Sequence, residues 1–113
     1  MLHDISVTNS LKKFCIIITT SDDQIIAEKI AEQLVEIDLA SCVQIDNVKS
    51  IFKWEGVISS NKEFRLMIKA KSEHYTQIQD LIVAIHNYEV PEIIKLDIAD
   101  GLASYLNWLD MKK

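Results

Sequence analysis

The chain has 113 residues and a mass of 12.9 kDa, the size of one domain with a core of its own. Hydrophobic residues make up 49% and charged residues 26%, with only 2 glycines and 1 proline, so disorder and collagen-like repeats are excluded. The formal net charge is −5, and Arg65 is the sole arginine. Binding to nucleic acid or to an anionic membrane is therefore disfavoured, because both interactions draw on lysine and arginine.

The chain contains two cysteines, Cys15 and Cys42, which are too few for a secreted disulfide framework. We expect buried structural thiols, the alternative being thiophilic metal binding or oxidant sensing. The first twelve residues lack the apolar core of a signal peptide, and no apolar run approaches the roughly 18 residues of a membrane span. We therefore expect a soluble, cytoplasmic protein, with residues 1–113 forming a single domain and residues 1–11 a loose N-terminal arm.

The first half of the chain predicts a strand followed by a helix. Residues 14–18 are a short β-branched run of the kind found in central strands. Residues 19–23 supply N-cap candidates and acidic residues suited to the start of a helix. Apolar residues then recur at helical spacing from Ile26 to Ile37, which predicts an amphipathic helix of about 16–18 residues.

A long hairpin is predicted next. Residues 42–58 have a β pattern, with a bulge or kink expected at Asp46-Asn47. Residues 59–62 carry a turn signal, and residues 64–69 alternate in polarity as a returning strand does. Its strands are expected to have about eight to ten residues, which is within the usual range for strands. The first and fourth strands are expected to be shorter, at about six residues, so the hairpin would extend past the rest of the sheet. An exposed edge that carries Phe52 and Trp54 needs cover, so we expect a symmetric homo-oligomer paired through this hairpin.

The second half predicts a helix, a strand and a final helix. Ser72 is a candidate cap for a helix over 75–85, which Pro91 keeps from continuing. A strand is predicted over 93–98 and a helix over 102–109. The order β-α-β-β-α-β predicts an α+β, ferredoxin-like sandwich with two helices on one face of an antiparallel sheet.

Five short motifs follow one another along the chain: residues 39–43 (LASCV), 54–56 (WEG), 68–69 (IK), 86–94 (HNYEVPEII) and 105–109 (YLNWL). Together they resemble the divalent-cation tolerance protein family, CutA. The resemblance runs from about Phe14 to Leu109. It implies a very stable homotrimer of ferredoxin-like subunits joined by strand pairing, and a link to copper and other divalent-metal tolerance.

The sequence departs from the family pattern at several positions. Asn87 stands where the family motif has proline, and Ala70 where threonine is common. The resemblance implies that copper ligands suggested for the family correspond to Thr19, Ile85 and His86. Only His86 keeps a metal-binding side chain.

The sequence offers two candidate sites. His86 with Glu89, and with Glu92 as a further candidate, suits weak binding of copper, zinc or nickel, although a firm site needs three or four ligands. The alternative is that His86 simply ends a helix.

A ligand-binding cleft between subunits is the second candidate, formed by Trp54, Glu55, Lys69, Tyr88 and Glu89. The alternative for these residues is a structural hydrogen-bond and ion-pair network at the subunit interface.

These observations favour a non-enzymatic trimer in metal tolerance, acting by weak divalent-metal binding or by regulating a partner, with no obligatory cofactor. The alternative is a small-molecule-sensing regulatory trimer that uses the cleft between subunits. Acyl phosphate hydrolysis, known for the same fold, is disfavoured because the loop of residues 20–23 is acidic and lacks glycine. RNA recognition is disfavoured because the first strand offers only Phe14 for stacking.

Overall fold

The computed structural model of the chain describes residues 13–113, so the predicted N-terminal arm lies outside the described residues. In chain order the elements are β1 (Phe14–Ser21), α2 (Gln24–Glu36), β2 (Cys42–Trp54), β3 (Val57–Lys71), the 3-10 helix η1 (Ser72–His74), α3 (Tyr75–Ile85), β4 (Ile93–Asp97) and α4 (Ala103–Asp110). The predicted α+β order with a final helix is confirmed.

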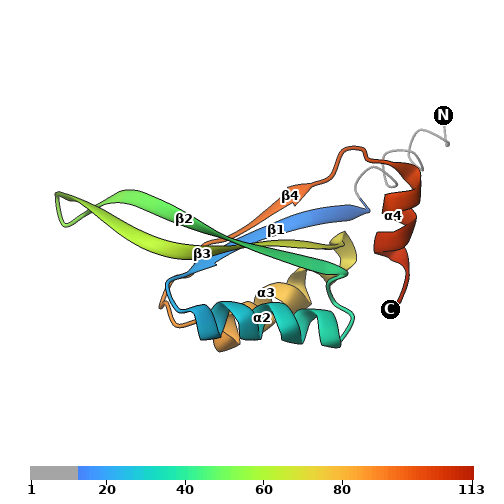
Figure 1. Cartoon of the computed structure of the whole chain (residues 1–113), viewed down its shortest axis with the longest axis horizontal. Coiled ribbons are helices and arrows are strands. Elements are labelled where there is room, and N and C mark those ends of the chain that lie inside the picture. Colours follow the sequence, from blue (N-terminus) through green and yellow to red (C-terminus); the bar gives the residue numbers. More distant parts are fainter. Residues whose placement is uncertain (1–12) are drawn as a thin grey trace.

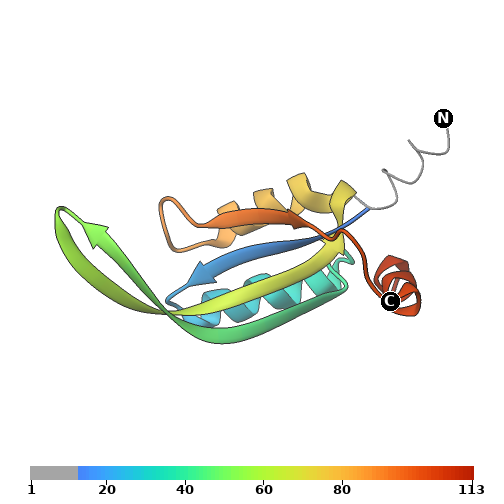
Figure 2. The ribbon, with the colours of Figure 1, turned by 90° about the horizontal axis from the view of Figure 1, so that it is seen from above.

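The four strands form one antiparallel sheet in the order β2-β3-β1-β4. Helices α2 and α3 cover one face of it, as Figure 1 shows from the side and Figure 2 from above. Alternate residues of the strands point toward the helices. Ile17 of β1 and its cross-strand neighbour Ile68 of β3 are fully buried there, against Ile30, Leu34 and Ile82 of the helices. This layer is the hydrophobic core.

Helix α2 begins at a capped residue and ends earlier than its apolar pattern predicts. The Asp23 carboxylate accepts hydrogen bonds from the backbone N–H groups of Ile25 (2.9 Å) and Ile26 (3.2 Å). These bonds satisfy two of the donors that a helix N-terminus leaves free. The helix stops at Glu36 because Asp38 has a φ of 61°, which is outside the right-handed helical region.

The hairpin turns at Glu55-Gly56, and the predicted turn at residues 59–62 is wrong. Glu55 and Gly56 have φ angles of 48° and 79°, the two positive values of a type I′ turn. Strands β2 and β3 pair without a break from Cys42 opposite Lys69 to Trp54 opposite Val57. The hairpin therefore extends well beyond the helices, as Figure 1 shows, in a molecule of 53 × 31 × 23 Å.

The predicted bulge at Asp46-Asn47 is also wrong, because the register of β2 and β3 is unchanged through these residues. Asp46 lies opposite Arg65, and the two side chains form a two-point ion pair with N–O distances of 2.8 and 3.2 Å. Opposite charges facing each other across two strands favour regular pairing. The polar pair that suggested an interruption is thus part of the ladder.

Ser72 does not cap α3 as predicted. It begins the 3-10 helix η1, and α3 follows at Tyr75 without a side-chain cap. The Ser72 hydroxyl is buried and has no hydrogen-bond partner within residues 13–113. The short 3-10 turn η1 therefore connects the end of β3 to the start of α3.

On the sheet face opposite α2 and α3, which we call the open face, neighbouring strands carry aliphatic side chains that neither of these two helices covers. Its aliphatic residues are Ile16, Ile18, Met67, Ile94 and Leu96. The side chains of Ile94 and Leu96 are 46% and 49% exposed. Neighbouring strands thus present a continuous apolar surface to the outside of the single chain.

Helix α4 is held against the end of the sheet by polar contacts at its last turn. The Asp110 carboxylate accepts from the ammonium groups of Lys13 at 2.9 Å and Lys71 at 3.2 Å. The Ser41 hydroxyl donates to the Leu109 carbonyl oxygen at 2.6 Å. The start of β1, the end of β3 and the end of α4 are therefore tied together.

The Asp110 contacts predict a pH-dependent stability. Hydrogen bonds from Lys13 and then Lys71 lower the pKa of the Asp110 carboxyl below its ordinary 3.8. A group whose pKa is lower in the folded than in the unfolded protein stabilises the fold above its unfolded pKa, and this stabilisation is lost as the pH falls through the folded pKa. Between about pH 5 and pH 2 we therefore expect the free energy of unfolding to fall more steeply in the wild type than in Asp110→Asn. Urea unfolding at a fixed protein concentration measures both profiles, and parallel profiles would contradict the expectation.

Candidate functional site

His86 connects the end of α3 to the end of β1 through both nitrogens of its ring. Its Nε2 lies 2.7 Å from the Thr20 carbonyl oxygen, and its Nδ1 accepts the backbone N–H of Tyr88 at 3.0 Å. A carbonyl can only accept and an amide N–H can only donate, so the imidazole is neutral with its hydrogen on Nε2. Strand β4 pairs with β1 only as far as Thr19. The carbonyl group of the next residue, Thr20, accepts the hydrogen bond from the imidazole instead. His86 is therefore a hydrogen-bonded link between the loop after α3 and the end of β1.

Tyr88 joins a polar cluster at the base of the hairpin. Its hydroxyl donates to the Glu63 carboxylate at 2.7 Å and accepts from the Asn61 amide at 3.2 Å. Glu63 is 8% exposed, and its other oxygen accepts from the Ser50 hydroxyl at 2.5 Å. Partial burial and the Glu63 carboxylate raise the pKa of Tyr88 well above its ordinary value. Tyr88 is thus a neutral donor that compensates a buried carboxylate.

The sequence did not single out Glu63, Asn61 or Ser50. The misplaced turn explains this, because residues 59–62 as a loop leave Glu63 at the start of a strand with no partner. Once the turn is placed at Glu55-Gly56, Glu63 lies within β3 opposite Val48. The signal that could have identified it is the Glu-Gly pair followed by an unbroken β pattern.

The residues predicted to form a ligand cleft do not meet within one chain. Trp54 and Glu55 lie at the tip of the hairpin, whereas Lys69 lies at the opposite end of β3, beside the Tyr105 ring at 5.6 Å. The thirteen residues from Val57 to Lys69 span about 40 Å of extended strand. Tyr88 is half-buried in the Glu63 cluster, and Glu89 is exposed. A cleft that contains all five residues requires a neighbouring copy of the chain, and it stays a prediction.

Residues 15–112 match the family described as CutA1 divalent ion tolerance protein. The chain belongs to this family. The resemblance that the five sequence motifs predicted is confirmed.

Two relatives show the extent of the similarity to CutA proteins. The divalent-cation tolerance protein CutA of Archaeoglobus fulgidus is 42% identical over 84 residues, which cover 74% of this chain and 82% of the relative. The protein of the same description from Thermus thermophilus is 36% identical over 95 residues, covering 83% and 92%. The similarity therefore spans most of each chain.

Solved CutA structures share the fold. The Archaeoglobus fulgidus structure, described as periplasmic, has a TM-score of 0.82 and 38% identity, covering 86% of this chain and 95% of that one. A structure from a psychrotrophic Shewanella, described as a stable protein, also has a TM-score of 0.82, with 40% identity and coverage of 87% and 92%. The four-stranded sheet and helices described above are those of CutA proteins.

Asn87, which replaces the proline expected from the CutA motif, forms contacts that a proline could not. Its amide oxygen accepts from the Ser21 hydroxyl at 2.6 Å, and its amide nitrogen donates to the Asp22 carboxylate at 2.8 Å. These bonds tie the loop after α3 to the loop before α2, beside the link formed by His86.

The residues at the copper positions implied for CutA proteins do not form a metal centre in the single chain. Thr19 is 1% exposed, its hydroxyl has no hydrogen-bond partner in the described part of the chain, and Ile85 has no ligating atom. Both ring nitrogens of His86 are engaged. Residues 13–113 contain no group of three or more His, Cys, Asp or Glu residues arranged to hold a metal ion. A firm copper or zinc centre needs three or four ligands, so these residues do not fit one.

The two cysteines remain free thiols in this CutA chain. Cys15 is fully buried, and burial raises the pKa of its thiol. The thiolate is the reactive form, so Cys15 is an inert core residue, as the sequence predicts. Cys42 is half-buried at the start of β2.

Proposed function

We propose that this CutA family member acts as a non-enzymatic, cytoplasmic homotrimer in the response to divalent metal ions. The observation that carries the proposal is the open face, on which Ile94 and Leu96 remain half-exposed in the single chain. Aliphatic side chains on neighbouring strands form a contiguous patch, and such patches mark association surfaces. Free thiols agree with a reducing compartment. No helix in residues 13–113 is long and apolar enough to cross a bilayer.

The sheet edges support a cyclic arrangement. β2 and β4 lie at opposite edges of the sheet, so each has one side without a strand partner within residues 13–113. Pairing β2 of one copy with β4 of the next is a head-to-tail contact, and such contacts form a closed ring of three copies when each copy is rotated by a third of a turn from the last. The apolar residues that protrude on the hairpin, Ile51, Phe52, Trp54 and Ile58, are 45% to 76% exposed and gain cover from the neighbouring copy.

Sedimentation velocity of the metal-free protein at micromolar concentration tests the assembly. We expect a single species of three chains that persists on dilution, because obligate interfaces are large and apolar. A species of 12.9 kDa at every concentration would contradict the proposal.

The metal part of the proposal is weak binding of copper or zinc that involves His86 and the exposed Glu89. A metal at His86 must replace one of the two hydrogen bonds of its ring, which lowers the net affinity. Isothermal titration of metal-free wild type and His86→Ala with copper and zinc measures this contribution. Weaker binding by the variant supports a role for His86, and equal binding excludes it as a ligand.

One observation favours the alternative, a small-molecule-sensing trimer. Lys69 lies at the end of β3 with its ammonium over the Tyr105 ring, and a cation beside an aromatic surface suits an organic anion. Thermal unfolding with nucleotides and carboxylates, compared with metals, separates the two functions, because a ligand of the native state raises the apparent stability.

A further inference from the structure

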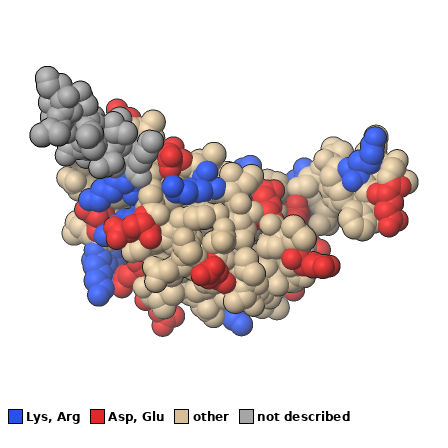
Figure 3. All heavy atoms as spheres, turned by 180° about the vertical axis from the view of Figure 1, so that it is seen from behind, with Lys and Arg blue, Asp and Glu red and all other residues tan. Residues whose placement is uncertain are grey.

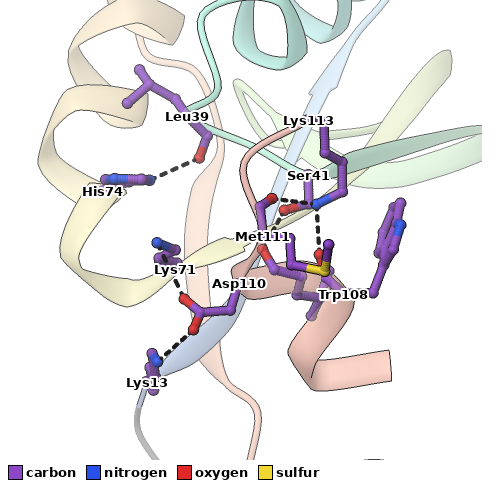
Figure 4. A network of polar contacts seen from close by, with 10 residues as sticks. Lys13, Leu39, Ser41, Lys71, His74, Trp108, Asp110, Met111 and Lys113 are labelled. Carbon is purple, nitrogen blue, oxygen red and sulfur yellow. Dashed lines mark hydrogen bonds and ion pairs between the residues drawn. The ribbon is translucent and has the colours of Figure 1, made fainter. Parts of the chain in front are cut away.

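A cavity of about 250 Å³ lies where the end of α2, the helix η1 and the end of α4 meet. Figure 4 shows this region, with His74 and Leu39 on one side and the last turn of α4 on the other. Val35, Leu39 and the fully buried Leu109 give the cavity an apolar wall. Its size suits a small metabolite.

The polar wall of the cavity carries an excess of positive charge. Lys71 lines it and shares the single Asp110 carboxylate with Lys13, so this trio has a net charge of about +1 from simple charge counting. Lys113 also lines it, and its ammonium donates to the carbonyl oxygens of Trp108 and Met111, which are neutral acceptors. The Lys113 ammonium is therefore held by neutral partners, the two carbonyl oxygens and the Trp108 ring, whose centroid lies 4.2 Å away.

Two further charged side chains on the cavity wall leave it with more positive than negative side chains. Lys112 adds a positive charge, and Asp38 and Asp110 are the acidic side chains that line the cavity among the described residues. Figure 3 shows lysine and acidic side chains gathered at this end of the molecule. The whole chain has a formal net charge of −5, whereas the side chains that line this cavity include more lysines than carboxylates. The cavity is therefore more attractive to an anion than the rest of the surface is.

His74 adds an oriented hydrogen-bond acceptor to the cavity wall. Its Nδ1 donates to the Leu39 carbonyl oxygen at 3.2 Å, which fixes the half-buried ring. Its Nε2 has no hydrogen-bond partner within residues 13–113. The ring is thus held by one nitrogen while the other remains available to a bound molecule, in contrast to His86.

We propose that this cavity binds a small organic carboxylate. The carboxylate lies toward Lys71 and Lys113, and the hydrocarbon part lies against Val35, Leu39 and Leu109. The site is complete within one chain and lies on the helix-covered side, so it requires neither the open face nor the trimer. It is also distinct from the predicted cleft at Lys69.

Isothermal titration of the full-length protein with acetate, butyrate and butyramide tests the proposal. We expect butyrate to bind about tenfold more tightly than acetate, because each buried methylene contributes about a three- to fourfold gain in affinity. We expect no measurable binding of butyramide, which has the same shape without the charge. Equal binding of butyrate and butyramide, or no binding of butyrate, would overturn the proposal.

Lysine variants locate the binding. Lys71→Gln is expected to weaken butyrate binding by about tenfold, since an ionic contact within a partly enclosed site is lost. Lys29→Gln, at an exposed lysine of α2 that does not line the cavity, is expected to bind as the wild type does. An equal loss in both variants, or an equally strong response to inorganic phosphate, would show charge attraction alone, and a loss found only in Lys69→Gln would place the carboxylate at the predicted cleft. Each of these results would overturn the proposal. Sedimentation of the same samples reports the oligomeric state separately.

Discussion

Leu96→Asp is expected to convert the proposed trimer into single chains. Leu96 lies on the open face opposite Ile16 and is 49% exposed in the single chain. If this face is buried between copies, the variant places an unpaired carboxylate in an apolar interface, at a cost of about 3–5 kcal/mol. That cost weakens association by at least about a hundredfold. Sedimentation velocity over a dilution series measures the change.

Val83→Asp is the matched control. Val83 is 57% exposed on α3, close to the value for Leu96, but it lies on the helix-covered side of the sheet. In an isolated chain the two substitutions would place a carboxylate in similarly exposed positions and have similar small effects. A trimer that survives both substitutions would place the interface elsewhere.

His86→Ala is expected to lower the free energy of unfolding by about 2–4 kcal/mol, since it removes two hydrogen bonds and half-buried packing. The Thr20 carbonyl and the Tyr88 N–H lose their partner together, and the ring contact between His86 and Tyr88, with centroids 4.8 Å apart, is lost as well. Urea unfolding of the metal-free protein at a fixed concentration measures this loss.

His86→Gln separates the two hydrogen bonds. A glutamine amide can reach the position of Nε2 and donate to the Thr20 carbonyl, but it cannot also accept the Tyr88 N–H from the position of Nδ1. We therefore expect a loss of stability about half that of His86→Ala, from the usual worth of one hydrogen bond. A glutamine variant as unstable as the alanine variant would instead show that the imidazole ring contributes mainly through packing.

The element order was predictable because its signals are local. Asp23 was among the predicted cap residues, Pro91 lies in the loop that follows α3, and Gly101 precedes α4. The hairpin turn was not predictable in the same way. Residues 59–62 have ordinary turn composition, but their strand pairing and the Asp46–Arg65 contact favour a ladder that continues through them. Tertiary pairing overrode a local preference, as is common for strands.

The candidate site was predictable only in part. Tyr88 and His86 were identified from one stretch of sequence, but their partners Glu63 and Thr20 come from other strands. No spacing rule relates these residues, because their contact depends on the register of β3 and on the length of α3. The cavity beside His74 likewise arises from segments far apart in the chain, and His74 alone gives no sequence signal for it.

The position of β1 in the sheet has a consequence for how the chain folds. β1 is the first strand in the chain, yet its two neighbours in the sheet, β3 and β4, begin only at Val57 and Ile93. During synthesis, Phe14–Ser21 therefore remains without either neighbour while most of the sequence is still being made. Contacts between residues so distant in sequence form slowly, and an unpaired apolar strand invites pairing with other nascent chains. Assembly of this sheet therefore depends on the arrival of its last strand.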